Sequence, residues 1–520
     1  MGQKIVSLIT GYAESHPDKA ALIDADTDQV LSYRELDART NQCARLFARE
    51  GLNFGDHIAV MTENIAEALI VVHAAHRCGL YVTPVNWHLT ADEAAYVIRD
   101  CMAKWLVISP GVLAVAEEFG VEIDTGVSRW IIGEAGGGYQ SLLPVLDSLP
   151  DDPLDEELQG AMMYYSSGTT GKPKGILRSL ERSATDSEPD GLIQLMQGLY
   201  GFDGDTVYLC PAPIYHAAPL AWSMNVQRMG GTVILMQRFN EVQALQLIER
   251  YHINRAQFVP TMFVRMLKLP EEIRQQYDVS SLKAAIHAAA PCPVEVKKAM
   301  LSWWGPVVYE YYAGSEGGGF CAVGPEEWLE HPGTVGRAMT GVVHILDDEG
   351  NAIFAGEVGN VYFDGGADFE YHGDQEKTRE AYNNKGWSTL GDMGYLDEEG
   401  YLYLTDRKSH MIISGGVNIY PQEAENVLSG HPAILDIAVI GVPNEEFGEE
   451  VKAVVQLIDT ADASDKLGAD IISYCVERLA KFKCPRSVDF VDELPRLPTG
   501  KLLKRQLRNR YWPDETLKKL

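Results

Sequence analysis

Short apolar runs alternate with capped, amphipathic segments through the first four hundred residues, and this alternation restricts the fold more than any other feature. Residues 32–35, Ser-Tyr-Arg-Glu, form a capping box that predicts a helix running to Gly51, and residues 90–93, Thr-Ala-Asp-Glu, predict the start of another. The runs at 57–61 and 105–108 predict buried strands. Because strands that alternate with helices usually pair in parallel, we expect an α/β fold with mixed and parallel sheets.

The pattern changes near residue 405. A strand-like run at 401–405 is followed by a polar break, and beyond it helix and strand patterns start again, with a helix beginning at Pro421. The 520 residues leave room for roughly three to four domains or subdomains, and about 110 residues suffice for a small domain. We therefore expect a large N-terminal domain of several subdomains at 1–407 and a small α+β C-terminal domain at 408–520.

Charge and apolar content narrow the range of partners. Lys and Arg number 44 and Asp and Glu number 74, which gives a net charge of −30. Proteins that bind nucleic acids or anionic membranes usually carry a basic surface, so we expect no nucleic-acid partner. The most apolar early stretch, residues 68–82, is too short and too polar to span a bilayer, so we expect no stable membrane insertion.

The cysteines indicate a reducing compartment. All eight are scattered and none forms a C-x-x-C pair, which argues against a zinc or redox cluster. The N-terminal residues do not follow the pattern of a signal peptide, so we expect a cytoplasmic protein. The sequence leaves the oligomeric state open, and a homodimer is among the states it allows.

Residues 164–175, Tyr-Tyr-Ser-Ser-Gly-Thr-Thr-Gly-Lys-Pro-Lys-Gly, follow an apolar strand expected at 161–165 and are the segment most indicative of function. Glycines let the backbone approach a ligand closely, and free N–H groups in such a loop bind anions. A Walker A loop is excluded, because Pro173 follows Gly171-Lys172 and Ser166 occupies the position of the required earlier glycine. The residues that we expect to contact phosphate are Ser166, Ser167, Gly168, Thr169, Thr170, Gly171, Lys172 and Lys174.

This loop and five further motifs, in the same order, resemble the signature of the adenylate-forming superfamily. That superfamily comprises acyl-CoA synthetases, luciferases and the adenylation domains of peptide synthetases. The resemblance covers essentially the whole chain. The further motifs are Ala-Ala-Ala-Pro at 288–291, Tyr-Tyr-Ala-Gly-Ser-Glu at 311–316, Trp-Ser-Thr-Leu-Gly-Asp at 387–392, the junction at 406–421, and Leu-Pro-Arg-Leu-Pro-Thr-Gly-Lys at 494–501.

The resemblance implies an AMP-forming acid–CoA ligase that uses ATP, Mg²⁺ and coenzyme A. In the first step a small-molecule carboxylic acid attacks the α-phosphate of ATP and pyrophosphate leaves. Both reactants are anionic, so fixed positive charge must bring them together. In the second step the thiol of coenzyme A attacks the acyl-adenylate.

Three residues are expected at the reacting phosphate. By the resemblance, Glu316 binds Mg²⁺, a cation that prefers carboxylate oxygen. Ser315 contacts the α-phosphate, although the family prefers Thr there. Lys501 is the catalytic lysine, which reaches the carboxylate and the α-phosphate as negative charge builds.

Four residues are expected around the nucleoside. By the resemblance, Ala289 belongs to the adenine-side turn and Tyr312 packs on adenine. Asp392 accepts hydrogen bonds from the ribose hydroxyls. Arg407 binds ribose or phosphate at the junction between the domains.

The second step involves the small domain. The resemblance implies that this domain is mobile and rotates about a hinge at or beside Lys408-Ser409. Ser414, Gly415 and Gly416 then line a pantetheine channel, where glycine lets the backbone approach the ligand. Ser409 and His410 depart from the family pattern, which often has Lys or Asp followed by an acid.

The acyl pocket is expected around residues 213–216, Pro-Ile-Tyr-His, with His216 beside the reacting carboxyl or gating the tunnel. No acid lies between Pro211 and Gln227 to hold an α-amino group, which favours a plain carboxylic acid. Residues 317–319 are three glycines that either deepen the pocket for a fatty or bulky, ring-containing acid or form a flexible turn.

Three other functions stay open at this point. The first is an adenylating enzyme that loads the phosphopantetheine of a carrier protein. The second is a luciferase-like oxygenase, which shares the first step. The third is a nucleotide-binding protein without enzymatic activity.

Overall fold

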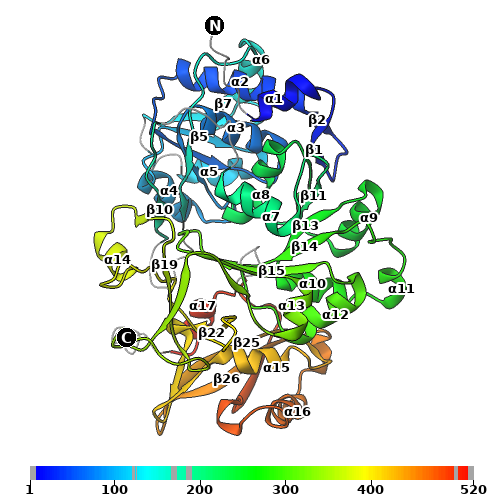
Figure 1. The fold of residues 1–520 in the computed structure, drawn as a ribbon, viewed down its shortest axis with the longest axis vertical. Coiled ribbons are helices and arrows are strands. Elements are labelled where there is room, and N and C mark those ends of the chain that lie inside the picture. Colours follow the sequence, from blue (N-terminus) through cyan, green and yellow to red (C-terminus); the bar gives the residue numbers. More distant parts are fainter. Residues whose placement is uncertain are drawn as a thin grey trace. The chain divides into compact units, whose positions relative to one another are not determined.

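The computed structural model describes residues 8–119, 123, 126–165, 173–182, 190–496 and 502–512. Figure 1 shows the helices and strands coloured along the sequence. The chain divides into two compact units, and each unit is built from more than one stretch of sequence. The first unit comprises Met1–Phe258, Leu269–Ile286 and Asp368–Thr378. The second comprises Val259–Lys268, His287–Ala367 and Arg379–Leu520.

A six-stranded sheet in the first unit is parallel throughout. Its central strands are buried along their whole length, as parallel strands covered by helices on both faces should be. In order across the sheet the strands are β7 (Gln140–Ser141), β6 (Ser128–Ile131), β5 (Trp105–Ile108), β3 (His57–Met61), β4 (Tyr81–Pro84) and β8 (Ala161–Met162).

The capping boxes begin helices as predicted. Helix α2 (Tyr33–Arg49) starts at Ser32, and α4 (Ala91–Asp100) starts at Thr90. The strands predicted at 57–61 and 105–108 are β3 and β5. The expected α/β class is therefore confirmed.

A nine-stranded sheet includes, in this order, β14 (Ala284–His287), β13 (Arg255–Phe258), β11 (Val207–Cys210), β12 (Thr232–Leu235), β1 (Ala20–Asp24) and β2 (Val30–Ser32). Strand β12 pairs in parallel with β1 and β11, and β11 pairs in parallel with β13, whereas β2 pairs with β1 in antiparallel fashion. The remaining helices of the first unit are α1 (Leu8–Ser15), α3 (Ala66–Arg77), α5 (Leu113–Phe119), α6 (Leu142–Asp147), α7 (Gly191–Tyr200), α8 (Ala217–Arg228), α9 (Glu241–Tyr251) and α11 (Glu271–Arg274).

The strand expected at 161–165 is two strands. Ala161–Met162 is the edge strand β8 of the parallel sheet, whereas Tyr164–Tyr165 is β9 of a separate antiparallel sheet with β10 (Gly175–Leu177) and β20 (Glu370–Tyr371). The buried Met163 lies between them. The chain therefore changes sheets directly before the glycine-rich loop.

The second unit contains three antiparallel systems. The first consists of β17 (Arg337–Thr340), β16 (Phe320–Val323) and β15 (Val308–Ala313), and the second of β18 (Val342–Leu346), β19 (Gly359–Asp364), β21 (Asp392–Leu396) and β22 (Leu402–Arg407). The third consists of β24 (Val417–Ile419), β23 (Ile412–Ser414), β26 (Gly448–Leu457) and β25 (Ile434–Asn444), to which β27 (Ser487–Val491) adds in parallel.

Helices complete the second unit. They are α10 (Pro260–Leu267), α12 (Val294–Trp304), α13 (Pro325–Glu330), α15 (Pro421–Leu428), α16 (Asp465–Val476) and α17 (Lys504–Asn509), while α14 (Gln375–Glu380) lies where the chain passes from the first unit to the second. Helix α15 begins at Pro421, as predicted. Residues 412–484 supply the hydrophobic core of the third sheet, and the domain boundary at 407 stays a prediction.

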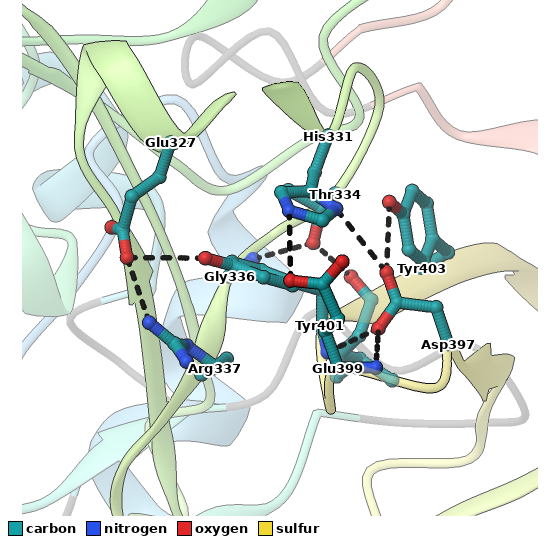
Figure 2. A network of polar contacts seen from close by, with 10 residues as sticks. Glu327, His331, Thr334, Gly336, Arg337, Asp397, Glu399, Tyr401 and Tyr403 are labelled. Atoms are coloured by element: carbon teal, nitrogen blue, oxygen red, sulfur yellow. Dashed lines mark hydrogen bonds and ion pairs between the residues drawn. The ribbon is translucent and has the colours of Figure 1, made fainter. Parts of the chain in front are cut away.

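A polar network holds the turn between β21 and β22 (Figure 2). Tyr401 donates a hydrogen bond to Glu327 at 3.2 Å, and Arg337 donates to the same carboxylate at 2.9 Å. The ring of His331 stacks on Tyr401 and its Nδ1 lies 3.4 Å from Asp397. The network thus ties α13 and β17 to the closed end of the β21–β22 hairpin.

Two further observations concern membrane-spanning helices and cysteines. None of the helices in the described part of the chain combines the length and apolar character needed to cross a membrane. All eight cysteines are free, and most are buried.

Arg77 holds α2 and α3 together through a buried ion pair. It donates to Asp37 at 2.6 Å and to Asn41 at 2.5 Å, with 2% of its side chain exposed. We expect Arg77→Met to lower the free energy of unfolding by about 3–5 kcal/mol, because the carboxylate of Asp37 would stay buried without its partner. Urea unfolding followed by tryptophan fluorescence measures this change.

The matched control is the exposed pair of Arg34 and Asp18, which are 3.0 Å apart. Arg34→Met should cost less than about 1 kcal/mol, because solvent screens this pair. Equal losses in the two variants would contradict the structural role of Arg77.

Candidate active site

The glycine-rich loop is flanked by two strands that pair with each other. Tyr165 of β9 lies opposite Gly175 of β10, so the two ends of the loop are held side by side. This placement differs from a Walker A loop, which joins a strand to a helix. The predicted phosphate contacts Ser166, Ser167, Gly168, Thr169, Thr170, Gly171 and Lys172 lie outside the described residues.

Lys174, the described lysine of this loop, forms an ion pair within the first unit. Its Nζ lies 3.1 Å from a carboxylate oxygen of Asp374. The backbone N–H of Lys377 and then the Lys174 ammonium lower the pKa of Asp374, and its carboxylate raises the pKa of Lys174 in turn. Lys174 is therefore charged and already oriented by an acid three residues beyond β20.

His216 also belongs to the first unit. It occupies the N-cap position of α8, its N–H donates to the carbonyl of Pro213, and its ring centroid lies 4.3 Å from that of Tyr215. Helix α8 carries no acidic side chain, so the part of the predicted acyl pocket on this helix offers no counter-ion to an amino group.

In the second unit, three predicted site residues from three motifs come together. The hydroxyl of Tyr312 donates to Oδ2 of Asp392 at 2.6 Å, and Nε of Arg407 lies 3.3 Å from Oδ1. Burial, followed by the charge of Asp392, raises the pKa of Tyr312 well above its ordinary value. The phenol therefore keeps its proton and acts as the donor.

These side chains lie close together because of the register of one hairpin. Asp392 begins β21, Arg407 ends β22, and the two residues are cross-strand partners. Tyr312 reaches them from β15. A carboxylate oxygen has two lone pairs, so Asp392 can accept further hydrogen bonds from a ligand while it holds Tyr312.

Ser315 and Glu316 occupy the two central positions of a turn directly after β15. The turn is closed by a hydrogen bond from the N–H of Gly317 to the carbonyl of Gly314 at 3.0 Å. A Cβ at Gly314 would lie 2.8 Å from a carboxylate oxygen of Glu316, so that glycine leaves room for the acid.

The glycines at 318 and 319 serve close packing. Atoms of Ser388 fill the place of a Cβ at Gly318, and the ring of Phe363 fills the place of one at Gly319. The N–H of Ala367 also donates to the carbonyl of Gly317 at 3.0 Å. The expectation that missing side chains at 318 and 319 deepen the acyl pocket is therefore not met.

Ala289 adopts a strained backbone conformation in the adenine-side turn. Its φ is +73°, a region that costs an L-residue roughly 1–2 kcal/mol. Strain of this kind persists where the surrounding structure enforces it, and it is common at ligand sites. The turn follows β14 and leads into α12.

Gly415 and Gly416 form the two-residue turn of the β23–β24 hairpin. Their φ angles are +58° and +80°, and Ser414 pairs with Val417 across the turn. A two-residue hairpin loop of type I′ requires positive φ at both residues, a conformation that glycine adopts readily. A Cβ at Gly416 would meet no atom within 4 Å.

The junction after β22 contains a buried charge cluster that sequence analysis missed. Asp406 lies 3.7 Å from Nζ of Lys504 and 3.1 Å from Nδ1 of His410, and Lys504 also lies 2.8 Å from Glu425. Burial acts to raise the pKa of Asp406, but the charge of Lys504, the hydrogen bond and charge of His410 and the backbone N–H of Arg407 together lower the pKa to about 2. The sequence did offer a signal, because Lys504 follows the predicted catalytic Lys501 by three residues.

The predicted hinge residues lie in a short 3₁₀ turn, Lys408–His410. The N–H of Lys408 donates to the carbonyl of Gly391, and its Nζ lies 2.6 Å from Asp348. Lys501, the predicted catalytic lysine, lies outside the described residues.

Family models match most of the chain. Residues 10–369 match the model of the AMP-binding enzyme, and residues 423–501 match that of the AMP-binding enzyme C-terminal domain.

Proteins of known name resemble the chain over nearly its full length. The long-chain-fatty-acid–CoA ligase FadD13 of Mycobacterium tuberculosis is 32% identical over 95% of this chain and 96% of its own. The fatty acid–[acyl-carrier-protein] ligase ScoC of Streptomyces coeruleorubidus is 30% identical over 99% and 98%. The crystal structure of ATP-bound MatB from Rhodopseudomonas palustris matches with a TM-score of 0.83 at 28% identity, covering 97% of this chain and 98% of that one.

The bond between Tyr312 and Asp392 can be tested by nucleotide binding. We expect Tyr312→Phe to weaken ATP binding by about tenfold, because a hydrogen bond to a charged group contributes about 1.5–3 kcal/mol. Isothermal titration with ATP measures the dissociation constant.

Tyr403→Phe is the matched control. Its hydroxyl also donates to an aspartate of the same hairpin, Asp397, but at the turn end. This variant should bind ATP as the wild type does. An unchanged ATP affinity in Tyr312→Phe would show that the bond does not orient Asp392 for the nucleotide.

Proposed function

Because the chain belongs to the AMP-binding enzyme family, we propose that it is an AMP-forming acid–CoA ligase. It joins a carboxylic acid to the α-phosphate of ATP, releases pyrophosphate, and passes the acyl group to the thiol of coenzyme A. The main support for the proposal is that Tyr312 and Arg407 both contact the carboxylate of Asp392, although the three residues come from three separate motifs. The match to an ATP-bound structure supports ATP as the nucleotide.

The nucleoside is held by groups whose orientation is already fixed. Asp392 accepts hydrogen bonds from the ribose hydroxyls while Tyr312 and Arg407 keep its carboxylate in place. The ring of Tyr312 packs on adenine, opposite the turn that contains Ala289. Groups that are oriented before binding lose little freedom when the ligand arrives.

Glu316 is the residue that would hold Mg²⁺, because its carboxylate is the kind of ligand that this cation prefers. Mg²⁺ is usually bound through one or two carboxylates together with phosphate oxygens and water. No cluster of three or more His, Cys, Asp or Glu suited to a metal occurs among the described residues. The ion would neutralise charge on the phosphates.

The chain supplies the remaining positive charge from lysines. Lys172 and Lys174 would bind the β- and γ-phosphates, for which Lys174 has to exchange Asp374 for phosphate oxygen. Lys501 would stabilise the negative charge that builds between the carboxylate and the α-phosphate. His216 would lie beside the reacting carboxyl.

The small domain, residues 408–520, would serve the second step. The C-terminal family model lies within it, which supports a boundary near 407. When the domain rotates, the β23–β24 turn would line the path of pantetheine. The backbone of Gly415 and Gly416 can approach the ligand because neither residue has a side chain.

The acid is proposed to be a fatty or bulky, ring-containing one. Support comes from α8, whose segment offers no acid to an α-amino group, and from the fatty-acid ligase named among the relatives. Loading of a carrier protein is a second candidate function, because ScoC is named as a ligase of that kind and matches nearly as well.

The setting proposed for the enzyme is the cytoplasm. Eight free cysteines are typical of proteins in a reducing compartment. A homodimer is proposed as one state of the enzyme, which light scattering of the purified chain would establish.

Pyrophosphate release across a panel of acids tests the proposed function. We expect release with fatty or ring-containing acids and none with amino acids, because helix α8, next to the predicted pocket segment, carries no acid to pair with an amino group. Thioester formation with coenzyme A should exceed that with a holo carrier protein. The proposal is wrong if ATP binds but no acid releases pyrophosphate, and the reverse thiol preference would favour the second candidate.

Lys501→Ala tests the catalytic lysine. We expect it to reduce adenylation by about a hundredfold or more, because an oriented charge at the reacting phosphate is lost. It should largely spare thioester formation from supplied acyl-adenylate. The control is Lys298→Ala, which removes an exposed lysine that pairs with Glu295. Equal losses in both half-reactions would argue against the assigned role.

A further inference from the structure

The second unit contains a buried charge cluster that includes Glu310, a residue of the same strand as Tyr312. Nζ of Lys297 lies 2.6 Å from Oε2 of Glu310, and both side chains are almost wholly buried. Nε2 of His287 lies 3.4 Å from the same carboxylate oxygen. The ammonium group of Lys297 also lies 4.7 Å from the ring centroid of Trp328.

This cluster is expected to stabilise the core less than apolar residues in the same place would. Burying an ion pair costs desolvation that its attraction often fails to offset, so apolar residues usually serve at least as well. Lys297 lies in the first turn of α12, where the helix dipole disfavours a cation. Neither ring nitrogen of the buried His287 makes a hydrogen bond, and burial lowers the pKa of this residue well below its ordinary value. Such costs indicate a role other than stability.

The three residues stand at both ends of the adenine-side turn and beside Tyr312. His287 is the last residue of β14 and directly precedes the turn with the strained Ala289. Lys297 lies on α12, the helix that follows the turn. Glu310 is two residues before Tyr312 on β15, so both side chains are on the same face of the strand.

We propose that His287, Lys297 and Glu310 are positioning residues that set the spacing between the adenine-side turn and Tyr312. They recognise the purine indirectly, by fixing the width of the gap into which its ring would fit. None of them needs to touch the nucleotide. This inference rests on the nucleotide site of the proposed function.

The test is nucleotide binding without any acid. In the double variant Lys297→Met, Glu310→Leu the ion pair becomes an apolar contact, which should leave the thermal midpoint near that of the wild type. We expect the dissociation constant for ATP to rise by about tenfold to a hundredfold, because small misplacements in a preorganised site have effects of this size. The preference for ATP over GTP should fall at the same time.

The control is a second buried ion pair that no nucleotide motif adjoins. The double variant Arg77→Met, Asp37→Leu removes it from α2 and α3. It should leave both ATP affinity and the preference for ATP over GTP unchanged. The variant Lys297→Arg, which keeps the charge, should retain more of the ATP affinity than Lys297→Met does.

The outcomes separate this inference from the proposed function. If the Lys297–Glu310 double variant binds ATP and GTP as the wild type does, the positioning role is wrong, whatever the wild type catalyses. If it loses affinity and discrimination while no acid releases pyrophosphate in the wild type, the positioning role stands and the ligase activity is wrong. A wild type that binds neither nucleotide would overturn both.

Discussion

Asp392 and Arg407 stand opposite each other because one hairpin, β21–β22, starts with the first and ends with the second. The antiparallel register leaves their side chains close enough for a charged contact, and Tyr312 completes the arrangement from another sheet. A shift of one residue in that register would turn the two side chains to opposite faces. The polar network at the closed end of the hairpin, which includes Tyr401, helps to fix the register (Figure 2).

The same strand also connects the nucleotide site to the small domain. Successive residues of a strand point to opposite faces, so Arg407 can meet Asp392 while its neighbour Asp406 meets Lys504 of α17. A change in the backbone at 406–407 therefore affects both contacts. This link gives a physical route by which a ligand at the proposed nucleotide site would alter the placement of α17.

Much of this fold could be predicted from signals that lie close together in the sequence. Contacts between distant segments could not be predicted in this way. The capping box at Ser32 and the buried run at 57–61 depend on neighbours in sequence, and both predictions were confirmed. The expected strand at 161–165 is divided at Met163 because its two halves join different sheets. The packing at Gly319 depends on Phe363, which is distant in the sequence. The positions of the site residues came from motif order. The Lys297–Glu310 pair stayed hidden because neither residue belongs to a motif.

The excess of acidic residues affects the cations that are predicted to bind ligand. Two cations predicted to bind ligand each face a carboxylate within their own unit, as Lys174 faces Asp374 and Arg407 faces Asp392. The pairing keeps these groups charged and oriented in the absence of ligand. An anionic ligand must then displace the carboxylate from the cation or share the cation with it. The ligand therefore gains less binding free energy than it would from a cation without a partner. A net charge of −30 is therefore compatible with binding polyphosphates, and it favours reversible binding of substrate and release of product.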